Sequence, residues 1–184
     1  MISKGCGIIK YMFLDPATIV ANFQISTGMS VADFGAGAGH FVFAMANVVG
    51  TEGRVYSLDI RQEMIEVVNG YARLHNVPQV TTILCNLEEK NGSTLTSESL
   101  DFVLCSTILH QVDNPFTVLK EAFRVLKSAG RIVIIDWEQS NIVQPGKMFT
   151  QKDAINTLSQ CGFVFKEALA DAGDHHYGVI GEKT

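Results

Sequence analysis

Apolar runs and helix-like stripes alternate along the chain. The runs are rich in Val, Ile and Leu without a clean polar alternation, which is typical of parallel strands covered on both faces. Five such runs lie at residues 31–34, 54–59, 80–85, 100–105 and 131–136. The segments between them space their apolar residues three and four apart, as one buried face of a helix requires. The pattern therefore predicts repeated strand–helix units.

Capping signals mark the ends of these helices. Asn114 before Pro115 is a cap followed by proline in a first turn, and it opens a stripe that runs to Leu126. We expect Gly130 to end that helix. Helical stripes also cover residues 41–48 and 64–71, and a short leading helix fits residues 16–25. A last helix should begin after Thr150, with Asp153 as its capping-box partner, and should stop near Gly162.

The end of the chain changes character. Residues 163–168 and 177–180 read as two strands, joined by a turn cluster at residues 171–174. Strand–helix units followed by a hairpin predict an α/β fold. It would be an open, doubly wound sheet with an antiparallel strand at one side.

Composition narrows the class of protein. The 184 residues are 47% hydrophobic and 18% charged, which predicts a single domain over residues 1–184 with an irregular segment at 1–15. No apolar run approaches the roughly 18 residues that span a bilayer. Residues 1–11 lack a continuous apolar core, so we expect no signal peptide and a cytoplasmic protein. A net charge of −5 without a basic run argues against nucleic acid as a partner.

A glycine-rich loop carries the strongest functional signal. Gly35, Gly37 and Gly39 follow the first apolar run, and the next run ends in Asp59. A strand, a glycine loop, a helix and an acid at the tip of the next strand indicate a nucleotide-binding βαβ unit. In the dinucleotide pattern a third glycine would stand at His40. Asp33, two residues before the loop, suits a ligand with an ammonium or sulfonium group better than a pyrophosphate.

The segment 33–39 resembles motif I of the class I S-adenosylmethionine-dependent methyltransferases. Segments 85–89, 100–110 and 119–137 resemble later motifs, and the branch that includes the ubiquinone/menaquinone methyltransferases is the most similar. The resemblance implies a Rossmann-like, mostly parallel seven-stranded sheet in the order 3-2-1-4-5-7-6, with the last strand antiparallel and helices on both faces. S-adenosyl-L-methionine would be the methyl donor. The donor-binding residues implied are Asp33, Gly35, Ala36, Gly37, Gly39, Asp59, Ile60, Met64, Asn86, Leu87, Ser106 and Thr107.

Two departures from the family concern the substrates. The family often has Asp where this chain has Asn86, whose amide oxygen can still accept from an adenine amino group. The link between Trp137 and Thr150 is short where many relatives carry a longer insertion, so the acceptor cannot be carried over. A small molecule is the expected acceptor, and the oligomeric state, a homodimer included, stays open.

Catalysis of methyl transfer needs positioning more than a fixed set of side chains. His110 follows the fourth strand, where an imidazole could take a proton from the acceptor or could cap the next helix. Asp136 at the tip of the fifth strand could orient the acceptor or belong to loop structure. A donor-binding protein without catalysis and an NAD-dependent oxidoreductase are the alternatives; His40 and Asp33 argue against the second.

The cysteines point to no metal or metalloid site. Cys6, Cys85, Cys105 and Cys161 form no CxxC pair and stand near no histidine at metal-ligand spacing. Two of them end apolar runs, where a thiol usually packs as a small hydrophobe. We therefore expect no metal, and an arsenite-type acceptor is disfavoured because the spacing offers no trapping set.

Overall fold

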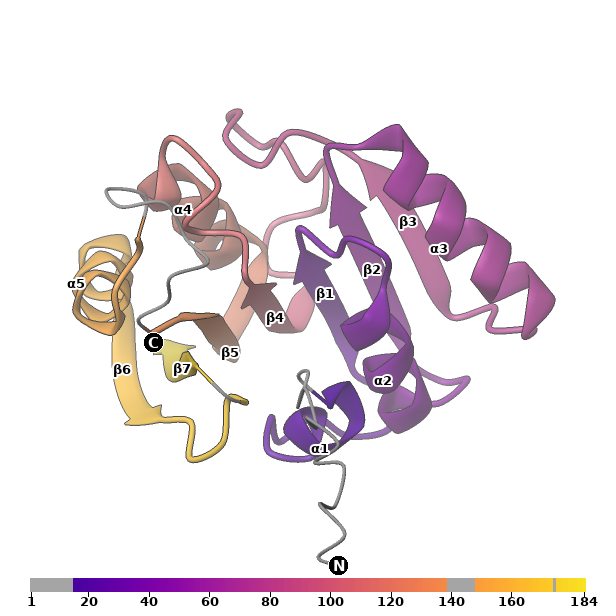
Figure 1. Cartoon of the computed structure of the whole chain (residues 1–184), viewed down its shortest axis with the longest axis horizontal. Coiled ribbons are helices and arrows are strands. Elements are labelled where there is room, and N and C mark those ends of the chain that lie inside the picture. Colours follow the sequence, from indigo (N-terminus) through magenta and orange to yellow (C-terminus); the bar gives the residue numbers. More distant parts are fainter. Residues whose placement is uncertain (1–14, 139–147, 174) are drawn as a thin grey trace, which may run out of the picture.

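The computed structural model describes residues 15–138, 148–173 and 175–184. Within these ranges the strands form one seven-stranded sheet in the order β3-β2-β1-β4-β5-β7-β6 (Figure 1). The strands β1 to β5 are parallel, and β7 is antiparallel to both β5 and β6. The expected fold class and strand order are confirmed. The strands are β1 (Ser30–Phe34), β2 (Arg54–Asp59), β3 (Val80–Leu84), β4 (Leu100–Ser106), β5 (Leu126–Trp137), β6 (Phe163–Ala168) and β7 (His176–Lys183).

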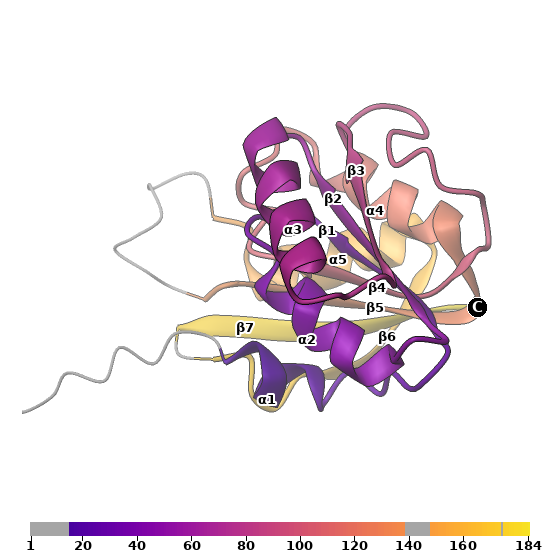
Figure 2. The ribbon, with the colours of Figure 1, turned by 90° about the vertical axis from the view of Figure 1, so that its right-hand side faces the viewer.

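Helices cover both faces of the sheet, as Figure 2 shows from the side. The helices are α1 (Pro16–Val20), α2 (His40–Val49), α3 (Gln62–Leu74), α4 (Pro115–Val125) and α5 (Gln151–Cys161). One apolar core joins α1, α2 and α3 to one face, and a second core joins α4 and α5 to the other. Both faces of the central strands are therefore buried, which explains their continuous apolar sequences.

The predicted caps of two helices are present. The Asn114 side chain accepts from the amide of Thr117, 3.2 Å away, at the start of α4. Thr150 and Asp153 form the capping box of α5, which ends at Gly162 in the left-handed conformation, with φ of 102°. These local signals satisfy backbone groups that a helix end leaves unpaired.

Three boundaries differ from the sequence-based expectation. Gly130 does not end α4, because Leu126 is already extended and pairs with Leu100 of β4, so residues up to Gly130 belong to β5. The leading helix stops at Val20, where backbone turns replace helical hydrogen bonds. The last strand begins at His176 and continues to Lys183, because β7 pairs with β5 from His176 to Glu182 and with β6 at Lys183.

Some expectations fall outside the described residues. The segment 1–14, most of the link that follows Trp137, and Asp174 of the predicted turn cluster are among them. Within the described ranges, no helix is both long and apolar enough to cross a bilayer.

The sheet order creates a switch point between β1 and β4. From β1 the chain continues outward through β2 and β3, and it then returns to place β4 on the other side of β1. Ligands of open α/β sheets bind outside the carboxyl ends of the strands at such a point. The glycine loop and the residues after β2, β3, β4 and β5 all lie at this edge (Figure 1).

Candidate active site

The glycine loop is held tightly between β1 and α2. The amides of Gly35 and Ala36 both donate to the Leu58 carbonyl, at 2.8 and 2.9 Å. Gly35 has φ of +77°, and a Cβ there would lie 2.3 Å from the side chain of Ile108. Only glycine fits such a position without strain or a clash. Glycine at this position therefore allows the loop to pack closely against Ile108.

Asp59 at the tip of β2 faces this loop. Its side chain is 5% exposed, and Oδ2 accepts from the Gly37 amide at 2.8 Å. Its Oδ1 accepts from the Arg61 amide at 3.0 Å and from the Arg61 Nε at 3.1 Å. Burial would raise the pKa of Asp59, but the hydrogen bonds from Arg61 and Gly37 outweigh it and hold that pKa below its usual value. Asp59 is thus a fixed, ionised acceptor beside the loop.

Asp33 is a second carboxyl at this edge, with a different environment. It is 2% exposed near the end of β1, and it pairs in register with Ser57 of β2. Burial raises the pKa of Asp33 to about 7, and the negative charge of Asp59 adds to the shift. Within the described residues, the buried Oγ of Ser57 has no hydrogen-bond partner. A cationic ligand would favour the ionised form of Asp33.

The loop after β3 lies beside Asp59. The amide of Cys85 donates to the Asp59 carbonyl at 3.0 Å, which continues the pairing of β2 with β3. Asn86 follows, and its Oδ1 accepts from the Glu88 amide at 3.0 Å. Leu87 is 6% exposed. The Asn86 amide oxygen thus already holds one hydrogen bond, and a carbonyl oxygen can accept a second.

His110 and Asp136 meet at the ends of β4 and β5. The His110 Nδ1 lies 2.6 Å from the Asp136 Oδ1, and the His110 amide donates to Oδ2 at 3.3 Å. The Trp137 amide also donates to the Asp136 Oδ1, at 2.9 Å. Asp136 is 1% exposed and His110 is 14% exposed. The carboxylate therefore fixes the imidazole from the buried side and leaves its other nitrogen for a ligand.

This edge is distinct from the cavity at the opposite end of the strands. That cavity, of about 320 Å³, lies between the segment after α1 and the start of β5, and its lining includes Phe23, Lys127 and Arg131. The cavity lies at the starts of β4 and β5, whereas the glycine loop follows the end of β1. Its basic side chains, Lys127 and Arg131, already pair with Asp101 and Glu182. It is not part of the candidate site.

Residues 25–175 match the family model described as "Methyltransferase domain". The chain belongs to the class I S-adenosylmethionine-dependent methyltransferases. The resemblance inferred from motif I is thereby confirmed, and S-adenosylmethionine is the methyl donor of this family.

Similar proteins agree with the family. The chain is 29% identical to the arsenite methyltransferase of Mus musculus over 112 residues, which are 58% of this chain and 30% of that enzyme. It is 28% identical over 155 residues to the ubiquinone/menaquinone biosynthesis C-methyltransferase of Haemophilus ducreyi, covering 83% of this chain and 57% of the relative. The chain thus matches only part of the length of these relatives.

A solved structure supports the fold of the methyltransferase domain. A SAM-dependent methyltransferase from Aquifex aeolicus superposes with a TM-score of 0.82 at 23% identity, covering 92% of this chain and 90% of that one. At that identity the likeness shows the fold alone.

The structure brings the expected donor residues of the methyltransferase domain to one edge. They lie at the carboxyl ends of β1, β2, β3 and β4 or in the first turn beyond them: Asp33, Gly35, Ala36, Gly37, Gly39, Asp59, Ile60, Met64, Asn86, Leu87, Ser106 and Thr107. Ile60 is 64% exposed, whereas Met64 on α3 is half-buried. Thr107 turns the chain sharply with φ of 53°.

Sequence reasoning missed two features of this site. Arg61 binds the Asp59 carboxylate, and Ile108 packs over Gly35. An arginine two residues after a strand end has no pattern of its own, so no sequence signal indicated that ion pair. Within the described residues, no group of three or more His, Cys, Asp or Glu side chains could hold a metal ion.

Proposed function

We propose that this chain binds S-adenosylmethionine at the carboxyl ends of β1, β2 and β3 and transfers its methyl group to a small molecule. The observation that carries the proposal is Asp59. It is a nearly buried, ionised carboxylate at the tip of β2, and it is oriented by the amide of Gly37. Two carboxylate oxygens side by side would match the two hydroxyls of a ribose once the exposed Arg61 side chain, which donates to both oxygens, turns away from them.

The neighbouring residues fit the rest of such a donor. Asp33 is a buried carboxyl whose charge a sulfonium or ammonium group would stabilise. Gly37 leaves its part of the loop without a side chain, and a Cβ there would meet only the Arg61 Nη2, 3.8 Å away, so a ligand can approach the backbone closely. Asn86 and Leu87 supply a polar group and an apolar surface for a base.

The remaining donor residues complete the site in this proposal. Ile60, just after β2, and Met64, in the first turn of α3, would contact the base. Ser106 and Thr107, at the end of β4, would contact the opposite end of the donor. Each of these roles follows from position at the shared edge.

The chain's contribution to the reaction is mainly positioning. S-adenosylmethionine, when bound, supplies an electrophilic methyl carbon. The protein must hold the acceptor atom in line with the bond that breaks and exclude water from it. Such alignment can supply roughly 7–11 kcal/mol of the barrier reduction.

His110 is the proposed base. Its Nδ1 is engaged by Asp136, so Nε2 is the nitrogen that can take a proton from an acceptor. Asp136 contacts His110, so we assign it as a positioning residue for the imidazole. A base is useful only if the acceptor carries a proton on the attacking atom, as hydroxyl, amine, thiol and acidic carbon groups do. We therefore propose a protic small molecule as acceptor.

A thiolate-bound arsenic acceptor is not supported by the described cysteines. Cys105 and Cys161 are buried, and Cys85 is half-buried. Burial raises the pKa of the Cys85 and Cys161 thiols to about 11, and that of Cys105 still further. Arsenic binding needs accessible thiolates, which these environments disfavour.

Two measurements test this function. Calorimetric titration with S-adenosylmethionine, S-adenosylhomocysteine and NAD should show binding of the first two only. Transfer of a labelled methyl group should then be followed across a panel of hydroxyl, amine, thiol and acidic-carbon compounds. Donor binding without transfer to any of these compounds would favour a non-catalytic donor-binding protein. Binding of NAD alone would favour an oxidoreductase.

A further inference from the structure

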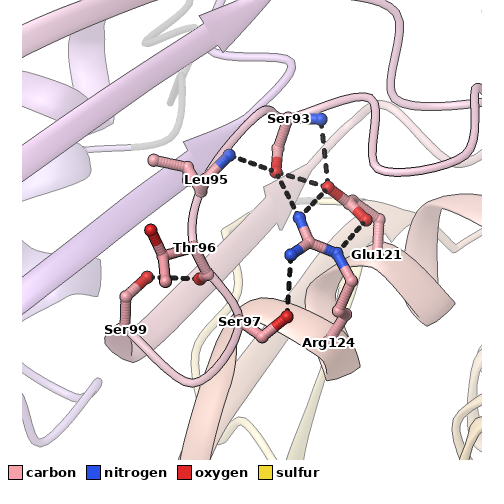
Figure 3. A network of polar contacts seen from close by, with 7 residues as sticks. All are labelled: Ser93, Leu95, Thr96, Ser97, Ser99, Glu121 and Arg124. Carbon is pink, nitrogen blue, oxygen red and sulfur yellow. Dashed lines mark hydrogen bonds and ion pairs between the residues drawn. The ribbon is translucent and has the colours of Figure 1, made fainter.

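The loop between β3 and β4 is tied to α4 by a buried polar network, drawn in Figure 3. The amide of Ser93 donates to the Glu121 Oε1 at 3.0 Å, and its hydroxyl donates to the same oxygen. Ser93 is 0% exposed and Glu121 is 4% exposed. A carboxylate on a helix thus holds a loop at a point where neither partner reaches solvent.

Arg124 completes the network. Its Nε donates to the Glu121 Oε2 at 2.8 Å, and its Nη2 donates to Oε1 at 2.7 Å. Its Nη1 reaches the Ser97 Oγ at 3.0 Å, farther along the same loop (Figure 3). Burial would raise the pKa of Glu121, but the hydrogen bonds from Arg124 and Ser93 outweigh it and lower that pKa. The buried carboxylate is therefore ionised and paired, as a charge in such a place must be.

The anchored part of the loop lies directly against Asn86. A Cβ on Gly92, the residue before Ser93, would lie 1.9 Å from the Asn86 carbonyl oxygen. Two turns connect these residues, because the Asn86 carbonyl accepts from the Glu89 amide and the Glu89 carbonyl accepts from the Gly92 amide. A shift of Ser93 would therefore be passed on to Asn86.

A second tie fixes the start of the same loop. The Glu88 Oε1 accepts from the Asn114 amide at 2.6 Å, just before α4 begins. The Glu88 amide in turn donates to the Asn86 side chain. Leu87 lies between Asn86 and Glu88, which this hydrogen bond joins. The helix α4 and its cap residue thus hold the loop at Glu88 and at Ser93, directly after Asn86 and Leu87.

We infer that Glu121, with Ser93 and Arg124, positions the loop that receives the adenine side of the methyl donor. The inference rests on the proposed function, because Asn86 and Leu87 are donor contacts only if that function holds. Glu121 is a positioning residue, since it acts through Ser93. A network needed for stability alone would connect α4 to the loop without affecting ligand affinity.

Two variants of the full chain test this inference. Ser93→Ala removes one hydroxyl, and Glu121→Gln removes the charge that pairs with Arg124. Thr150→Ala is the control, because it removes the cap of α5 and leaves the β3–β4 loop unchanged. Thermal unfolding first measures how much stability each of the three variants loses relative to the wild type, so that ligand binding is compared between proteins that are equally folded. Calorimetry then gives the dissociation constants of S-adenosylhomocysteine and adenosine, and hydrogen exchange reports on residues 85–99.

We expect the substitutions to change the affinity for the methyl donor and to leave the rate of the chemical step unchanged. Glu121→Gln should weaken both ligands about tenfold or more, and Ser93→Ala should weaken them less, with faster exchange in residues 85–99. In turnover, the KM for the donor should rise while kcat at saturating donor stays within about twofold. Thr150→Ala should match the wild type in all of these.

The outcomes separate this inference from the function on which it rests. If the wild type binds S-adenosylhomocysteine and Ser93→Ala and Glu121→Gln bind it equally well, the positioning role is wrong and the donor site stands. If Thr150→Ala weakens ligand binding as much as the other two variants do, the network contributes only to stability and the positioning role is also wrong. If the wild type binds neither ligand, the proposed function fails, and this inference fails with it.

Discussion

The imidazole Nδ1 of His110 lies 2.6 Å from the Oδ1 of Asp136, a carboxylate that is 1% exposed. His110 lies in the loop that follows β4, and Asp136 stands near the end of β5, the adjacent parallel strand. A buried acid that fixes one nitrogen of an imidazole leaves the other as an oriented proton acceptor. In the proposed site, this pairing supplies the base that takes a proton from the methyl acceptor.

Removal of the imidazole should affect turnover and leave donor binding intact. We expect His110→Ala to lower kcat by about 10²–10⁴-fold, the usual contribution of a general base. Asp136→Asn should also lower kcat, because an amide can present its NH2 group to Nδ1 and so favour the wrong tautomer. The affinity for S-adenosylhomocysteine should stay within about twofold in both variants.

A matched control is available in the same loop. Asp113 is an exposed acid between His110 and the start of α4. Asp113→Asn should leave turnover unchanged, since it changes the charge near the site without touching the pair. Equal losses of donor affinity and of kcat in His110→Ala would contradict the assignment and return His110 to a structural role.

Asp33 should make the stability of the protein depend on pH. Its folded-state pKa of about 7 lies above the usual value of 3.8, so the folded protein holds this proton more tightly than the unfolded chain does. The stability from Asp33 is fully present below about pH 4 and is lost as the pH rises through about 7. Between pH 5 and pH 8 the loss is roughly 3 kcal/mol of the free energy of unfolding.

Urea unfolding of the wild type and of Asp33→Asn at pH 5 and pH 8 measures this effect. The variant carries no titrating group at this position, so its stability relative to the wild type should rise between the two pH values. A difference between the two proteins that is the same at pH 5 and pH 8 would show that Asp33 does not titrate in this range.

Asp33 should also discriminate donor from product. S-adenosylmethionine carries a sulfonium charge that S-adenosylhomocysteine lacks, and an ionised carboxylate nearby favours the cation. The ratio of the two affinities should therefore shift toward S-adenosylmethionine as the pH rises through about 7. Titrations at pH 6 and pH 8 measure the ratio. In Asp33→Asn the ratio should not change with pH over this range, and a change of the wild-type size in that variant would place the charged group elsewhere.

Two glycine substitutions should have opposite effects. Gly35→Ala adds a Cβ at φ of +77° and 2.3 Å from Ile108, so it should cost about 1–3 kcal/mol of stability and weaken donor binding. Gly70→Ala in α3 meets no atom within 4 Å and has no positive φ, so it should stabilise the protein by about 0.5–1 kcal/mol. Thermal unfolding and donor titration check both. Normal donor binding by Gly35→Ala would argue against a ligand close to the loop.

The arrangement of the candidate donor site could be predicted from the sequence because its signals are local. The spacing of Gly35, Gly37 and Gly39 and the distance to Asp59 follow from one strand–loop–helix–strand unit. The structure places them as that unit requires, with the Gly37 amide on the Asp59 carboxylate.

The remaining contacts depend on the way distant segments pack. His110 and Asp136 are separated by a helix and a strand, and each had a plausible role alone. Glu121 lies beside the predicted apolar stripe of α4, where a carboxylate is normally solvated, yet it is buried against Ser93 of a loop. Arg61 could turn either way from the end of β2. Pairing of polar side chains across loops leaves no periodic pattern, so only the structure shows it.

In the proposed site Asp59 receives the ribose of a methyl donor. Calorimetric titration of S-adenosylhomocysteine into the wild type and into Asp59→Ala, at equal folded fractions, tests it most directly. We expect binding to one site per chain in the wild type and a dissociation constant at least about tenfold higher in the variant. Equal dissociation constants in the two proteins, or no binding by the wild type, would contradict it.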